Sequence, residues 1–145
     1  MINRSQRGQG AAEFAIALPF FIVLLLGVLD LGLAIYRSNG TSQAAREIAR
    51  AASVHPCSVP TACVLGDTPE VQAAIAVQKG LIPNLSDPTF KCVRPDGSVI
   101  SGAGSGCSPG YSVRVTVVAP YTPVTPLLGL TGAWNLQSSS TIRIQ

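Results

Sequence analysis

The chain has 145 residues, of which 47% are hydrophobic and only 12% are charged, and its net charge is +3. The ten basic residues are scattered and form no dense patch, so we do not expect nucleic acid as a partner. Carboxylates do not pair at a workable catalytic spacing, and the single histidine, His55, has no evident catalytic partner. We therefore expect neither an enzyme nor a cofactor or metal site.

An apolar run from Ala11 to Tyr36 dominates the N-terminal third of the chain. As a helix it would measure roughly 39 Å, enough to cross a bilayer core of about 30 Å with some tilt. Two arginines and no acidic residue stand before Glu13, and this bias predicts a cytoplasmic N-terminus and an extracytoplasmic remainder. Pro19 inside the run removes one backbone hydrogen bond, which should kink or loosen the helix near Ala15.

Gly8 stands five residues before Glu13, which heads the apolar helix. This spacing resembles the processing site of type IV prepilins. The resemblance implies cleavage after Gly8, a mature chain that begins at Gln9, and pairing of the Glu13 carboxylate with the terminal amine of a neighbouring subunit. The alternative is that Glu13 lies at head-group level, where its carboxylate only interacts favourably with the positive N-terminal end of the helix.

The run and the segment after it resemble the TadE-like proteins, which are minor pseudopilins of the tight-adherence (Tad, or Flp) pilus. Residues 13–32 contain Glu-Phe-Ala, an early proline, a leucine block, and Gly-x-x-Asp-x-Gly. Residues 43–52 contain Ala-Ala-Arg-Glu followed by Arg-Ala-Ala. The resemblance covers about residues 8–53. It implies other pilins and pseudopilins, the prepilin peptidase, the inner-membrane assembly platform and the lipid bilayer as partners.

Three residues of the run are the candidates for assembly: Glu13, Pro19 and Asp30. Asp30 is expected near the outer bilayer surface, about 25 Å beyond Glu13. At that position, Asp30 is either solvated among the head groups or forms a contact between subunits.

The helix is expected to continue through residues 37–55 as an amphipathic half that packs on the outer domain. Four apolar residues share its inner face: Ala45, Ile48, Ala49 and Ala52. The pair Asn39-Gly40 is a candidate weak point. The helix should end at His55-Pro56, because proline disfavours a helical residue before it.

The outer part, residues 56–145, is predicted to be a small α+β domain. A helix should run from Pro69 to Lys79, with Asp67 as its N-cap and Gly80 as its stop, and should lie on the sheet. A hairpin should turn at residues 95–98. Strands over residues 111–119 and 134–145 should pair antiparallel, joined by a proline-spaced crossing and by an apolar stretch at residues 127–130. That stretch either contacts the membrane or a partner, or packs in the core.

All four cysteines lie beyond the apolar run, which suits two disulfides in an oxidising compartment. Local closure favours the pairs Cys57–Cys63 and Cys92–Cys107, although the sequence leaves the other connectivities open. A zinc site is disfavoured, because no two cysteines form a Cys-x-x-Cys pair.

The expected architecture is α+β and type IV pilin-like: a long helix, packed in its second half on a small antiparallel sheet with one extra helix. We divide the chain into a leader (1–8), a transmembrane part (9–36), a soluble half of the helix (37–55) and the outer domain (56–145). The expected function is that of a minor pseudopilin that initiates or caps a Tad-type fibre, located first in the bacterial inner membrane and then at the cell surface. The alternative is a permanently anchored extracytoplasmic binding or adhesion module that never enters a filament.

Overall fold

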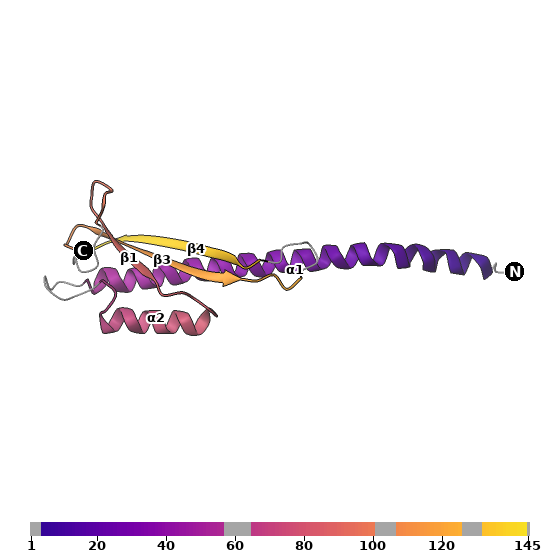
Figure 1. Cartoon of the computed structure of the whole chain (residues 1–145), viewed down its shortest axis with the longest axis horizontal. Coiled ribbons are helices and arrows are strands. Elements are labelled where there is room, and N and C mark those ends of the chain that lie inside the picture. Colours follow the sequence, from indigo (N-terminus) through magenta and orange to yellow (C-terminus); the bar gives the residue numbers. More distant parts are fainter. Residues whose placement is uncertain (1–3, 57–64, 101–106, 126–131, 145) are drawn as a thin grey trace.

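The computed structural model describes residues 4–56, 65–100, 107–125 and 132–144. Helix α1 (Arg4–Val54) runs through most of the length of the molecule (Figure 1). Its C-terminal half lies against a four-stranded antiparallel sheet and a second helix, whereas its N-terminal half projects away from them. This arrangement confirms the predicted α+β architecture.

Helix α1 is continuous, and neither Pro19 nor Gly40 interrupts it. It ends at Val54, one residue before the predicted end at His55-Pro56. At Gly40 an added Cβ would meet only ordinary contacts, the nearest being a methyl group of Ile82 at 3.8 Å. The candidate weak point at Asn39-Gly40 is therefore part of an ordinary helix.

The amphipathic half of α1 forms the centre of the core. All four residues of the predicted inner face are buried with at most 2% exposure, and Ala44 joins them. They meet the alternate valines of the longest central strand, Val113, Val115 and Val117, which are fully buried. Small alanine side chains allow the helix to approach the sheet closely, and this close packing holds the domain on α1.

The sheet contains β1 (Thr89–Val93), β2 (Val99–Ile100), β3 (Ser112–Tyr121) and β4 (Trp134–Arg143), in the order β2-β1-β3-β4. The predicted hairpin joins β1 to β2, and the predicted antiparallel pairing joins β3 to β4 over their whole lengths.

β3 ends two residues later than expected, at Tyr121, and includes Pro120. The reason is local: β1 covers β3 only from Ser112 to Thr116. At Pro120 only β4 flanks the strand, an edge position at which proline is tolerated.

Helix α2 (Pro69–Leu81) corrects three details of the prediction. Its N-cap is Thr68 and not Asp67, because Pro69 takes the first helical position and forces the residue before it to be extended. The helix continues past Gly80 to Leu81. It packs mainly against α1 rather than on the sheet, with Val71 and Ile75 buried in the shared core.

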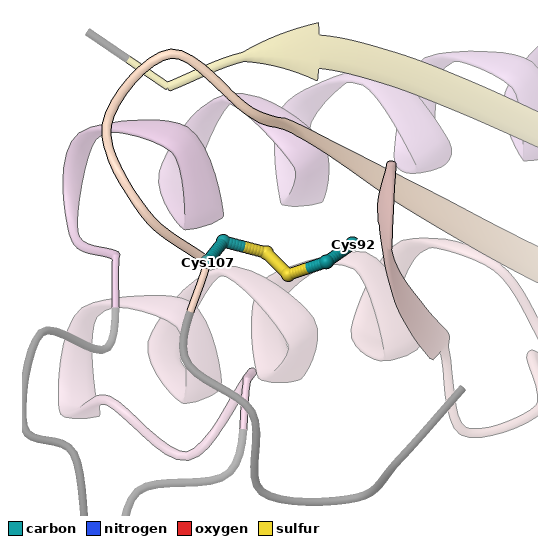
Figure 2. Close-up of a disulfide and its surroundings, with 2 residues drawn as sticks. All are labelled: Cys92 and Cys107. Carbon is teal, nitrogen blue, oxygen red and sulfur yellow. A yellow bond between two sulfur atoms is a disulfide. The ribbon is translucent and has the colours of Figure 1, made fainter. Parts of the chain in front are cut away.

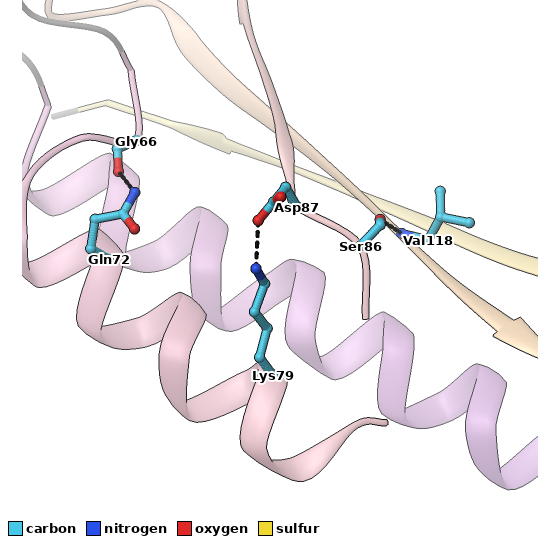
Figure 3. Close-up of polar contacts among 6 residues, drawn as sticks. All are labelled: Gly66, Gln72, Lys79, Ser86, Asp87 and Val118. Atoms are coloured by element: carbon cyan, nitrogen blue, oxygen red, sulfur yellow. Dashed lines mark hydrogen bonds and ion pairs between the residues drawn. The ribbon is translucent and has the colours of Figure 1, made fainter. Parts of the chain in front are cut away.

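Polar contacts fix both ends of α2 (Figure 3). The Gln72 side-chain amide donates to the Gly66 carbonyl at 2.9 Å, and Lys79 Nζ lies 2.5 Å from Asp87 Oδ1. Beyond this ion pair, Ser86 exchanges two hydrogen bonds with the Val118 backbone. The segment after α2 is thereby joined to β3 where β1 no longer covers it.

A disulfide joins Cys92 on β1 to Cys107, with their Cα atoms 5.7 Å apart (Figure 2). This confirms one of the two predicted pairs, and both residues are buried. The other predicted pair, Cys57–Cys63, and the apolar stretch at residues 127–130 lie outside the described residues.

Candidate functional site: the exposed half of the N-terminal helix

The N-terminal half of α1 carries its large apolar side chains on the outside. Between Phe14 and Tyr36 these side chains are from 37% exposed at Val23 to 75% exposed at Phe20. The helix is long and apolar enough to cross a membrane, and no residue of its most apolar window is buried in the domain. Soluble monomers rarely expose a continuous apolar surface of this extent, so the surface must be covered from outside the chain.

Glu13 stands at the start of this surface and is exposed. The Gln9 side-chain amide, one helical turn earlier, donates to Glu13 Oε1 over a long 3.4 Å. From Gln9 onward, no described side chain forms an ion pair with the Glu13 carboxylate. Gly8 lies in the first turns of the same helix. The three residues predicted for processing and assembly at this end, Gly8, Gln9 and Glu13, therefore follow one another along one exposed helix.

Asp30 has partners that the sequence did not reveal. Its Oδ1 accepts a hydrogen bond from the Val124 backbone N–H at 2.9 Å. Its Oδ2 accepts one from the Thr125 N–H at 3.1 Å and another from the Thr125 hydroxyl. Its backbone carbonyl accepts a bond from the Tyr121 hydroxyl at 3.0 Å. We call these four residues the Asp30 clasp.

The Asp30 clasp ties the apolar helix to the end of β3, across 91 to 95 positions of sequence. Tyr121 and Thr125 are buried by this contact. Burial raises the pKa of the Tyr121 hydroxyl above its ordinary value, and the nearby carboxylate adds to the rise. The hydroxyl therefore stays protonated and able to donate.

Trp134 begins β4 directly opposite Tyr121. Their ring centroids are 6.3 Å apart and the rings are tilted by 59°. Pro19 lies between Glu13 and Asp30 on the same helix and is exposed.

Elsewhere the described residues hold no group of three His, Cys, Asp or Glu side chains placed to bind a metal ion. A groove between the end of α1 and α2 includes Glu47, His55 and Glu70 in its lining. The backbone N–H of His55 continues the helical pattern by donating to the Ala51 carbonyl at 3.0 Å.

Comparison with known families gives a match over residues 8–50, to the TadE-like proteins. The match begins at Gly8, contains Glu13, Pro19 and Asp30, and ends within the buried half of α1. The resemblance seen in the sequence is confirmed over this segment. No curated protein and no solved structure matches the chain.

Proposed function

From the TadE-like character of its first helix, we propose that this Tad pilus-associated protein is a minor pseudopilin, cut after Gly8 and assembled through α1 to initiate or cap a Tad-type fibre. The observation that carries the proposal is the overlap between the family match and the exposed helix. The family match covers all of the exposed apolar helix from its first glycine. That exposed helix is the part of the chain that needs a partner.

The role of Glu13 follows from its surroundings. A carboxylate at the start of a membrane helix is costly unless another group compensates it. Cleavage after Gly8 would create a positive amine on Gln9, and the amine of a neighbouring subunit is the natural partner of the carboxylate. At 4 Å such a pair is worth about 1 kcal/mol in water and about 4 kcal/mol in a surface-like environment.

The rest of the proposed placement is consistent with this role. The N-terminus is cytoplasmic and the sheet domain is extracytoplasmic, where the Cys92–Cys107 disulfide is stable. The assembly platform and the other pilins contact α1, and the prepilin peptidase acts on the leader. The outer domain is what the fibre presents.

The cleavage step can be tested by intact mass in cells with and without a prepilin peptidase. We expect loss of residues 1–8 only when the peptidase is present. Gly8→Val should block cleavage, because a branched side chain replaces the residue before the scissile bond. Gly10→Ala is the matched control: a Cβ there would meet nothing within 4 Å, so cleavage should continue. A chain that keeps residues 1–8 beside an active peptidase would overturn the proposal.

The carboxylate step needs a separate variant. Glu13→Gln keeps the shape of the side chain and its contact with Gln9 but removes the charge. We expect normal processing, a stable protein in the membrane, and failure to enter isolated pili. Normal incorporation of Glu13→Gln into pili would show that assembly does not require the Glu13 carboxylate. A processed wild-type chain that is never found in pili would instead favour the permanently anchored binding module.

A further inference from the structure

The rise per residue of α1 determines which of its residues lie within the thickness of a bilayer. From Phe14 to Asp30 the helix rises roughly 24 Å, which is less than the about 30 Å of a bilayer core. A core that begins at Phe14 therefore ends about four residues beyond Asp30, near Ala34. The next charged residue, Arg37, lies one turn farther on. Asp30 thus lies about one helical turn inside the outer boundary of the apolar core, next to the head groups and not out in bulk water.

A carboxylate at this depth needs donors, and the protein supplies them. Both Asp30 oxygens are occupied by Val124 and Thr125, and the carbonyl is occupied by Tyr121. Because these bonds are direct, Tyr121, Val124 and Thr125 must lie at about the same depth as Asp30. The outer domain therefore cannot stand clear of the membrane on a stalk of helix.

The surface around the Asp30 clasp has the composition of a membrane interface. Three large side chains here are apolar or aromatic and point outward: Val124 is 71% exposed, Tyr36 is 74% exposed and Trp134 is 40% exposed. The exposed polar neighbours, Thr122 and Asn135, are uncharged. Trp and Tyr are enriched where a protein crosses the head-group region. The sequence adds an independent observation, since it contains no charged residue between Arg114 on β3 and Arg143 on β4. The whole connection at this end of the sheet is uncharged.

We propose that the end of the sheet nearest the Asp30 clasp, with Val124 and Trp134, is set into the outer head-group region of the bilayer that α1 spans. We call this surface the lipid-facing rim. Its partner is the phospholipid bilayer. The inference rests on the membrane anchoring contained in the proposed function, and it adds that the outer domain itself contacts lipid.

Trp134 is the only tryptophan of the chain, so its fluorescence reports on the rim without any substitution. The full chain is reconstituted in phosphatidylcholine vesicles that contain lipids brominated either near the carbonyl or near the end of the acyl chain. We expect emission blue-shifted from that of the urea-unfolded chain, and at least about twofold stronger quenching by the carbonyl-proximal bromine. Acrylamide in the water should quench weakly. Strong acrylamide quenching with no effect of either brominated lipid would overturn the rim.

A relocated reporter provides the control. In Trp134→Phe combined with Val77→Trp, the single tryptophan moves to an exposed position on α2. Val77 lies beside Glu47 and Val54 in the last turns of α1, well beyond Asp30 along that helix. The relocated tryptophan should be quenched by acrylamide and not by either lipid. Quenching of this reporter by the brominated lipids would show that lipid contact is not confined to the rim, and would overturn the proposal.

Anchoring is measured on the same vesicles by sedimentation after an alkaline wash. A chain that stays with the vesicles but shows a water-exposed Trp134 overturns the rim and leaves the anchor intact. A chain washed off the vesicles overturns both the rim and the membrane anchoring.

Discussion

The two halves of α1 belong to one continuous helix, yet their side chains differ in size and in surroundings. The half that crosses the domain turns alanines and one isoleucine toward the core, and these side chains are buried to 2% exposure or less. The other half uses phenylalanine, leucine and isoleucine and leaves them exposed. Small side chains suit close packing on a sheet that the chain itself provides. Large ones serve a surface whose partner comes from outside, either lipid or other helices.

The sharpest way to break this comparison is one substitution made in both halves. Ile48→Ala removes a fully buried side chain and should lower the free energy of unfolding by about 2–5 kcal/mol. Ile16→Ala removes a side chain that is 69% exposed and should change the free energy of unfolding by no more than about 0.5 kcal/mol. Urea unfolding of the full chain in detergent micelles, followed by Trp134 emission, measures both. Equal losses would contradict the division of α1 into a core half and an external half.

The boundary between the halves can be tested at the Asp30 clasp. Asp30→Ala leaves the Val124 and Thr125 N–H groups without their acceptor, so these amides should exchange with deuterium faster. Asp30→Asn retains one acceptor oxygen, so its amide exchange rates should fall between those of Asp30→Ala and the wild type. Leu29→Ala, at the exposed neighbouring position, is the control and should leave exchange unchanged. Identical exchange in Asp30→Ala and wild type would mean that the clasp does not hold the end of β3.

The smallest expected effect lies far from the helix, in the hairpin turn. Two hydrogen bonds from Ser98 hold the pKa of Asp96 below its ordinary value. The bond from the Ser98 hydroxyl has the larger effect and the bond from the Ser98 N–H the smaller. A pKa that is lower in the folded state contributes stability above the unfolded value of about 3.9, and this contribution is lost as the pH falls through the folded value. Asp96→Asn should therefore flatten the acid side of the stability profile slightly, as measured by urea unfolding between pH 6 and pH 3. An unchanged profile would show that this turn does not contribute.

Sequence patterns were informative wherever a structure repeats locally. The three- and four-residue spacing from Ala45 to Ala52 predicted the buried face, and the strand expected over residues 111–119 is β3, whose alternate valines are buried. Local rules failed where two rules competed. Asp67 is a good N-cap residue, but Pro69 fixes the start of α2 and makes Thr68 the cap.

The Asp30 clasp could not be predicted at all. No periodicity or spacing relates an aspartate in an apolar helix to two amide groups more than 90 residues later. The only trace in the sequence is the uncharged stretch between Arg114 and Arg143, which indicates an unusual environment but not its partner. Contacts of this kind depend on tertiary packing, which brings the end of β3 down along α1.

The direction of the strands has a mechanical consequence. β3 and β4 run along the α1 axis, as the bonds from Tyr121 to Asp30 and from Ser138 to Ser42 require (Figure 1). A pull on the N-terminal end of α1 against the outer domain therefore acts along the surface where the helix meets β3 and β4. Loaded in this shear direction, the contacts between α1 and the sheet bear the force together, whereas a crosswise pull would separate them one after another.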